Sequence, residues 1–144
     1  KVDIIASDHA PHLPKEKERG YHEAPSGVPG VETLLPLLLD SVNHGALNLE
    51  DVVRMTSYNP AQIFGIFKKG KIAIGKDADL VVVDMSEERE VRNEKLYTKC
   101  GWSPFHGKIL KGWPIMTVVG GKMVFRDGKV DENFQVGREV KFGK

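Results

Sequence analysis

The stretch Ser7-Asp8-His9-Ala10-Pro11-His12 decides how this chain is interpreted. It follows the apolar run Val2–Ala6, and its last five residues hold one carboxylate and two imidazoles. The apolar run predicts a short buried strand over residues 2–7. An aspartate that ends a buried strand and opens a long polar loop is typical of the catalytic positions of barrel enzymes. Asp8 is therefore the first candidate catalytic residue.

The composition is that of a globular protein. The chain of 144 residues is 40% hydrophobic and 28% charged, with a formal net charge of +1. This charge gives no reason to expect a nucleic-acid partner. No window reaches the roughly 18 apolar residues that a membrane span needs, so we expect no membrane association. The single cysteine, Cys100, excludes an internal disulfide and is typical of a reducing compartment, which predicts a cytoplasmic location.

The first half of the sequence indicates one strand, a long loop and helices. Residues 8–29 form a loop with four prolines, and a loop of this length usually has a functional role. Residues 30–39 are apolar on nearly all sides and predict a buried helix. A second helix begins after Asn48, which can cap it, and Pro60 ends or restarts this helix.

The second half indicates short strands separated by glycines. Residues 78–84 form an apolar run bounded by aspartates, and residues 115–125 predict a β-hairpin with a turn at Gly120-Gly121. We therefore place a strand, a loop and helices in residues 1–66, and a β domain in residues 67–144. One strand and two helices cannot close an eight-stranded barrel. The chain also begins without an initiator Met, so we expect a fragment of a longer protein.

Several motifs occur in the order found in one enzyme family. The motifs are Ser7–His12, Ala24–Thr33, Asn59–Ala61, Gly70–Leu80, Ser103–Phe105 and the final Gly-Lys-Met-Val hairpin. This order closely resembles the carboxyl-terminal portion of dihydroorotases, which are cyclic amidohydrolases of the amidohydrolase superfamily. The Gly70–Leu80 pattern is common to many amidohydrolases. The Asp-His-Ala-Pro-His run with the later Pro-Gly-x-Glu-Thr is narrower and points to dihydroorotases.

The resemblance implies an α/β fold. Residues 1–66 would be the last βα unit or units of a TIM-type metal-dependent hydrolase barrel, and residues 67–144 a small β-sandwich. In the family this sandwich also takes strands from the amino end of the chain, so we expect it to be incomplete here. The chain has Gly101–Phe105 where the usual pattern is Asn-Thr-Pro-Phe. We expect this departure to lie in the β domain and to leave the chemistry untouched.

The resemblance also implies a zinc-dependent reaction. Asp8 would ligate one metal of a one- or two-zinc (Zn²⁺) site and exchange a proton with the bridging water. Elementary chemistry agrees, because zinc lowers the pKa of bound water to about 7. A carboxylate beside that water can accept its proton and deliver it to the departing nitrogen. The other zinc ligands of the family are expected upstream of this chain.

Three further residues match the substrate-binding positions of the family. His12 would contact the substrate carboxylate through an imidazole N–H, and the backbone of Ser26 and Gly27 would contact the pyrimidine ring. Ser26 and Gly27 can also be read as a simple turn, and Asp8 as a turn former or a helix cap. His9 is expected to be structural, because successive residues of an extended chain face opposite ways. The charged run Lys15–Arg19 is either a solvated loop crest or part of a mobile flap.

The implied activity of the whole protein is that of a dihydroorotase. This enzyme reversibly cyclises N-carbamoyl-L-aspartate to L-dihydroorotate in de novo pyrimidine biosynthesis. The chain alone is expected to be inactive. The implied partners are these small-molecule substrates, with a homo-oligomer or an association with aspartate transcarbamoylase as further expectations. The alternatives are a hydantoinase or allantoinase, and a non-catalytic homologue with a scaffolding role.

Overall fold

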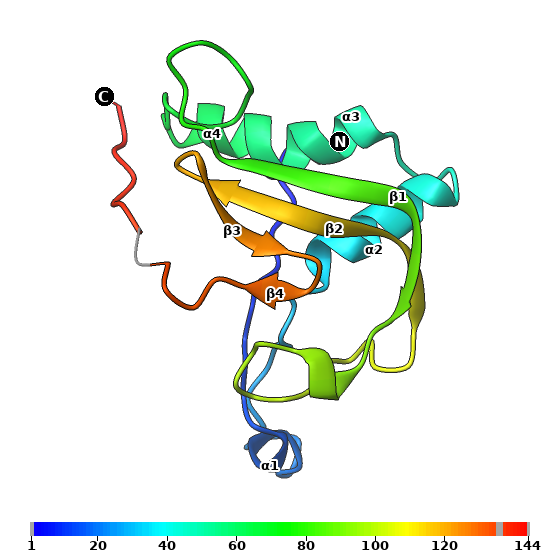
Figure 1. Ribbon diagram of the computed structural model, residues 1–144. Helices are drawn as coiled ribbons and strands as arrows, with labels where there is room; N and C mark the ends of the chain where they lie inside the picture. Colours follow the sequence, from blue (N-terminus) through cyan, green and yellow to red (C-terminus); the bar gives the residue numbers. More distant parts are fainter. Residues whose placement is uncertain (1, 135–136, 144) are drawn as a thin grey trace.

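The computed structural model describes residues 2–134 and 137–143 (Figure 1). Among these residues, four strands form one antiparallel sheet in the order β1-β2-β3-β4. The helices are α1 (Pro14–Lys17), α2 (Leu34–Asn43), α3 (Leu49–Val53) and α4 (Asn59–Ile63), with a π-helical turn at Arg54–Tyr58 and a 3-10 turn at Asn93–Lys95. The strands are β1 (Leu80–Glu90), β2 (Ile109–Val119), β3 (Lys122–Arg126) and β4 (Lys129–Val130).

The sheet confirms the predicted hairpin. Val119 pairs with Lys122 across a turn in which Gly120 and Gly121 both have positive φ. Strand β1 is longer than the predicted apolar run, because it continues through a charged segment to Glu90. That segment is held by pairing with β2, as in the register Arg89↔Leu110. Pairing with a neighbouring strand therefore outweighs the weak strand propensity of charged residues.

The core lies where α2 packs against β2. Leu39 on α2 is 1% exposed and Leu110 on β2 is fully buried. Gly112 on β2 has φ +103°, and a Cβ at this position would lie 2.7 Å from the Cβ of Leu39. Polar contacts join the same elements, since the Asp40 carboxylate accepts a 2.9 Å hydrogen bond from the Lys111 amide. The helices precede residue 66 and the strands follow it, and the two parts share this core.

The helix predicted after Asn48 forms, with an irregular middle. Asn48 occupies the N-cap position of α3, but its side chain makes no capping hydrogen bond. Pro60 restarts the helix rather than ending it, because it lies in the first turn of α4 after the π-helical turn. The first turn of a helix tolerates proline, since its missing N–H has no partner there. Within the described residues, none of the helices has the length and apolar character needed to cross a bilayer.

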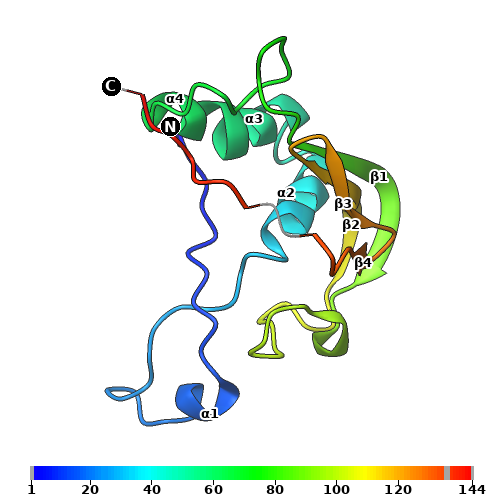
Figure 2. The same ribbon diagram turned by 60° about the vertical axis from the view of Figure 1, so that its left-hand side comes forward.

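The predicted strand over residues 2–7 is wrong. This segment has no strand structure, and its residues are exposed or half-buried. The Ile5 amide donates to the carbonyl of Met55 at 3.2 Å, and Asn59 Nδ2 donates to the carbonyl of Asp3 at 2.7 Å. Figure 2 shows the segment running well apart from the sheet. A strand needs a neighbouring strand to pair with, and the described residues place none beside this segment.

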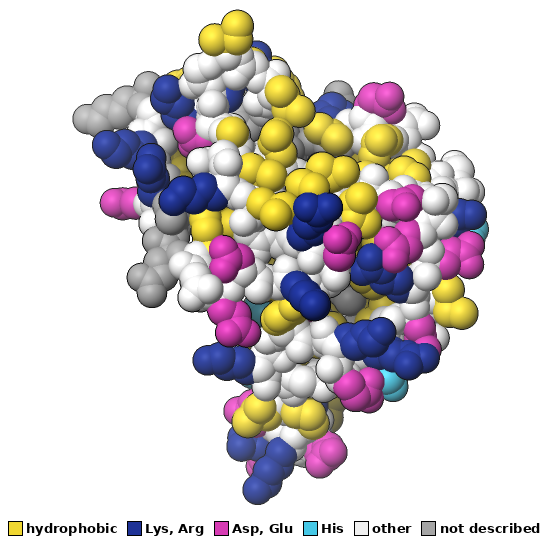
Figure 3. All heavy atoms as spheres, viewed as in Figure 1, with side chains coloured by type: hydrophobic (Ala, Val, Ile, Leu, Met, Phe, Trp, Pro, Cys, Tyr) yellow, Lys and Arg dark blue, Asp and Glu magenta, His cyan; other side chains and the backbone are white. Residues whose placement is uncertain are grey.

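The described residues contain one sheet, whereas a sandwich needs two. Helix α2 covers one face of this sheet (Figure 1). On the opposite face, hydrophobic side chains gather over β1 and β2 (Figure 3). The exposed apolar residues of the strands include Val81, Val82 and Met123. The β domain is therefore a single layer over the part of the chain that the structure describes.

Candidate catalytic loop

Asp8 has an unusual backbone conformation. Its φ is +43°, in the left-handed region that few residues other than glycine adopt. Aspartate is among the side chains that tolerate this region best. The side chain is exposed at this bend. Strained backbone of this kind is concentrated at functional sites, so the conformation supports the choice of Asp8 as a candidate.

The structure brings the Asp8–His12 stretch together with the segment that contains Ser26 and Gly27. His9 and Val28 form an isolated parallel bridge, and the Ala10 amide donates to the carbonyl of Val28 at 3.0 Å. The two segments meet between α1 and α2 (Figure 2). Four residues predicted to bind substrate or metal are therefore carried by two adjacent backbone segments.

Gly27 is required where it stands. Its φ is +87°, and a Cβ at this position would lie 2.6 Å from the Cβ of Ala10. A larger residue would push the two segments apart or force its own backbone out of the left-handed region. The absence of a side chain at Gly27 therefore allows the two segments to approach closely. An ordinary turn would need only the positive φ.

His9 supports the loop from inside. Its Nδ1 accepts hydrogen bonds of 3.2 Å from the backbone amides of both Gly30 and Val31. An imidazole nitrogen that accepts in this way carries a lone pair, so the ring proton lies on Nε2. The expected structural role of His9 agrees with these contacts.

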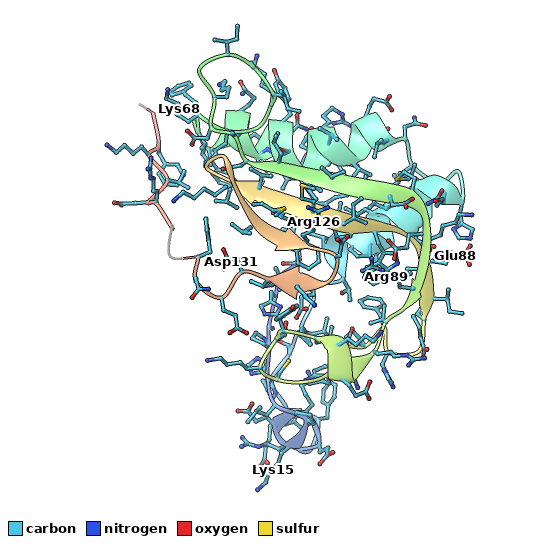
Figure 4. The ribbon with its side chains drawn as sticks, in the orientation of Figure 1. Lys15, Lys68, Glu88, Arg89, Arg126 and Asp131 are labelled. Atoms are coloured by element: carbon cyan, nitrogen blue, oxygen red, sulfur yellow. The ribbon has the colours of Figure 1, made fainter. Side chains whose placement is uncertain are left out.

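The charged run Lys15–Arg19 has two kinds of lysine. Lys15 points outward from α1 at the tip of the molecule (Figure 4). Lys17 points inward, and its Nζ donates to the carbonyls of Pro25 at 2.5 Å and Gly27 at 3.0 Å. Lys17 thereby holds both ends of the short segment that contains Ser26. The predicted solvated loop crest therefore describes Lys15, which is exposed. It does not describe Lys17, which is half-buried and bonded to the Ser26 segment.

Two residues that sequence reasoning did not select connect this loop to the segment between β1 and β2. The Glu32 carboxylate accepts hydrogen bonds from the amides of Tyr97 at 3.0 Å and Thr98 at 2.7 Å, and from the Thr98 hydroxyl. Trp102 Nε1 donates to the carbonyl of His12 at 2.7 Å. Through this bond, the Gly101–Phe105 segment contacts the backbone of His12. That the departure leaves the chemistry untouched stays a prediction. Glu32 is the glutamate of the Pro-Gly-x-Glu-Thr motif, and its place in this motif is the one feature of the sequence that could have selected either residue.

The aspartates of the Gly70–Leu80 motif have a structural role. Lys69 Nζ pairs with the carboxylates of Asp79 and, at 3.0 Å, Asp77. Asp79 also accepts a 2.7 Å hydrogen bond from the amide of Gly120 in the hairpin turn. These bonds raise the pKa of Lys69, mainly through the hydrogen bond to Asp79, and lower the pKa of Asp79, mainly through the hydrogen bond from Lys69. The motif fastens its loop to the β2–β3 turn.

The described residues do not form a complete zinc site. No group of three or more His, Cys, Asp or Glu side chains is placed to hold a metal ion among them. Catalytic zinc is held by three protein ligands and a water molecule. Asp8 can provide one such ligand, so the remaining ligands would have to come from outside these residues.

The sequence matches the model of the amidohydrolase family over residues 3–124. The chain therefore belongs to this family of hydrolases. Among curated relatives, it is 47% identical to a dihydroorotase of Halobacterium salinarum, over 98% of this chain and 33% of that protein. It is 46% identical to a dihydroorotase of Pyrococcus furiosus, over 100% of this chain and 34% of that protein. The chain thus spans about a third of the length of these relatives.

Solved structures of related enzymes have the same arrangement of elements. The L-hydantoinase (dihydropyrimidinase) from Arthrobacter aurescens has a TM-score of 0.84 and 37% identity, over 89% of this chain and 30% of that protein. The D-hydantoinase (dihydropyrimidinase) from a Thermus species has a TM-score of 0.85 and 31% identity, over 90% of this chain and 29% of that protein. The fold described above is therefore found within larger amidohydrolases.

Proposed function

We propose that this chain is the carboxyl-terminal third of a dihydroorotase. The observation that carries the proposal is its 46–47% identity to two curated dihydroorotases over at least 98% of its length. The two hydantoinases of known structure are 31% and 37% identical, which makes a hydantoinase the second candidate. In the complete enzyme, residues 1–66 would end a TIM-type barrel. The single sheet would be one layer of a β-sandwich.

Asp8 is the proposed proton-transfer group. In the hydrolytic direction, water adds to the ring carbonyl of dihydroorotate and the carbon–nitrogen bond of the ring breaks. The water must lose a proton, and the departing nitrogen must gain one. An exposed carboxylate in a fixed left-handed bend can accept the first proton and supply the second. Cyclisation of N-carbamoyl-L-aspartate is the same sequence in reverse, with release of water.

The neighbouring residues would bind the substrate. The His12 imidazole would donate a hydrogen bond to the substrate carboxylate, a charge-assisted interaction. The backbone of Ser26 and Gly27 would contact the ring. Gly27 packs against Ala10, and Ala10 belongs to the segment that carries Asp8 and His12. Zinc would supply the activated water in the family reaction. Asp8 is the one ligand among the described residues that we assign to it.

The complete protein is the right material for testing this proposal. We expect it to convert L-dihydroorotate to N-carbamoyl-L-aspartate, and the reverse, with much lower activity on hydantoin, dihydrouracil and allantoin. A preference for hydantoin or dihydrouracil would favour the second candidate. Inactivity on all of these substrates, with the other metal ligands missing upstream, would indicate the non-catalytic homologue.

The proposed setting follows from the same reaction. The partners are the small-molecule substrates, and the location is the cytoplasm, where the single reduced cysteine is expected. Self-association or association with an aspartate transcarbamoylase belongs to the proposal for the complete enzyme. Size measurement of the purified protein with and without an aspartate transcarbamoylase tests both forms of association.

A further inference from the structure

Trp102 makes a contact that the proposed chemistry does not explain. Its half-buried indole donates a 2.7 Å hydrogen bond from Nε1 to the backbone carbonyl of His12, 90 residues earlier in the chain. The tryptophan belongs to the Gly101–Phe105 segment, where this chain departs from the usual family pattern.

The contact completes the restraint of the His12 backbone. On the amino side, the His12 amide donates to the carbonyl of Ala10 at 2.9 Å, and the Ala10 amide donates to Val28 at 3.0 Å. On the carboxyl side, the His12 carbonyl accepts from Trp102. With the peptide groups on both sides held, the direction of the Cα–Cβ bond is fixed. The imidazole then moves only through its side-chain torsions.

The anchor itself is held in place. The Ser103 amide, next to Trp102, donates to Asn93 Oδ1 at 2.9 Å, and Ser103 is 7% exposed. The Glu32 carboxylate accepts a 2.7 Å hydrogen bond from the Thr98 amide, which lies just before the Gly101–Phe105 segment. A hydrogen bond from a restrained donor fixes the position of its acceptor, whereas a mobile side chain would follow the loop.

We infer that Trp102 is a positioning residue for His12, acting through the backbone and without contact to the substrate. The inference rests on the proposed function, because it takes His12 as the group that binds the substrate carboxylate. In physical terms, the hydrogen bond from Trp102 holds the His12 backbone in its binding position before the substrate arrives. Without the anchor, the imidazole must be ordered when the substrate binds, and this cost weakens binding more than it slows the bond-breaking step.

The kinetic test replaces each tryptophan of the chain with phenylalanine in the complete enzyme. Trp102→Phe keeps an aromatic ring and removes the N–H donor. We expect KM for dihydroorotate to rise about two- to tenfold, the range for loss of one neutral hydrogen bond, with kcat changed less than about twofold. Trp113→Phe is the matched control, because Trp113 Nε1 also donates to a backbone carbonyl, that of Leu110 at 2.8 Å. The control should leave KM unchanged, and an equal rise in both variants would overturn the inference.

A double-mutant cycle separates positioning from general stability. In a His12→Ala background, Trp102→Phe should cause no further rise in KM, because the group it positions is gone. An equal rise in both backgrounds would mean that Trp102 acts without His12.

A readout independent of activity separates this inference from the proposed function. Hydrogen exchange measured by mass spectrometry should become faster over residues 8–13 in Trp102→Phe and stay unchanged there in Trp113→Phe. If the wild-type protein does not act on dihydroorotate but this difference is seen, the proposed function is wrong and the anchoring of the His12 loop stands. If exchange over residues 8–13 is the same in both variants, the positioning role is wrong, whatever the activity.

Discussion

Gly27 and Ala10 lie so close together that a Cβ on the glycine would be 2.6 Å from the Cβ of the alanine. The contact joins the segment that carries Asp8 and His12 to the segment that carries Ser26. The parallel bridge between His9 and Val28 lies beside it. The relative position of the proposed catalytic and binding groups therefore depends on the absence of a side chain at position 27.

Gly27→Ala should damage the site and lower stability. The left-handed φ of +87° costs an alanine about 1–2 kcal/mol, and the overlap with Ala10 adds to this cost. We expect the melting temperature to fall and KM for dihydroorotate to rise, as measured by calorimetry and steady-state kinetics. Gly128→Ala is the control, because its φ is +81° and nothing lies within 4 Å of the added Cβ. An unchanged KM in Gly27→Ala would show that the separation of the two segments does not matter for binding.

Asp8→Asn should remove activity while keeping the fold. Asparagine tolerates the left-handed φ of +43° as well as aspartate does, so the substitution tests the charge rather than the backbone. We expect kcat to fall by about 10²–10⁴-fold, the range for loss of a general acid–base group. Asp8→Ala should abolish turnover. Near-normal activity in Asp8→Asn would exclude the proton-transfer role.

His12→Ala should act mainly on binding. Loss of a hydrogen bond to a charged group predicts a rise in KM of about ten- to a hundredfold, with some loss of rate. His44→Ala is a suitable control, because the exposed His44 forms its contacts with Asp40 on its own helix, outside the catalytic loop. A large fall in kcat with an unchanged KM would contradict the assignment of His12 to the substrate carboxylate.

The sequence predicted most of the secondary structure that local patterns determine. The glycine turn at 120–121 and the helix after Asn48 are recognisable because turn geometry and helical period act over a few residues. The strand over residues 2–7 was wrong because an apolar run specifies burial, and strand structure needs a neighbour that the described residues do not supply. The end of β1 at Glu90 was missed because pairing with β2 holds it.

The contacts that organise the candidate site could not be predicted, because they join distant residues. Trp102 reaches His12 across 90 positions, and Glu32 reaches Thr98 across 66. Lys17 was interpreted as part of a solvated charged run, since nothing in the run distinguishes it from Lys15. A sequence motif identifies which residues recur together. It does not tell whether a member such as Glu32 reacts with substrate or fastens a loop.

The Lys69–Asp79 pair should make stability depend on pH at both extremes. The pKa of Asp79 lies below its usual value of 3.8, so its contribution is present above that pH and is lost as the pH falls through the lowered pKa. The pKa of Lys69 lies above 10.5, so its contribution is present below that pH and is lost as the pH rises through the raised pKa. Asp79→Asn should lower the melting temperature at pH 7 and flatten the decline at acid pH.

The size of this effect should be modest. A surface ion pair contributes about 0–1 kcal/mol, and the hydrogen bond from Gly120 adds a similar amount. Asp77→Asn is the matched control, because Asp77 pairs with the same lysine at 3.0 Å but is not the carboxylate that binds the Gly120 amide. Asparagine keeps an acceptor oxygen for the Gly120 amide, so both substitutions test the charge of the carboxylate. An equal loss of stability in both variants would show that the two carboxylates contribute equally to the pairing with Lys69.

The isolated 144-residue chain should neither hold zinc at stoichiometry nor turn over dihydroorotate. A zinc ion needs several ligands arranged around it, and no set of three candidate side chains is assembled among residues 2–134 and 137–143. Asp8 by itself supplies one exposed carboxylate. A single carboxylate binds a divalent ion weakly, because water occupies the other coordination positions of the ion. Metal analysis after dialysis should find well below one zinc per chain, with no difference between the wild type and Asp8→Asn. Stoichiometric zinc that disappears in Asp8→Asn, or dihydroorotase activity of the metal-loaded chain, would mean that these residues assemble a site by themselves.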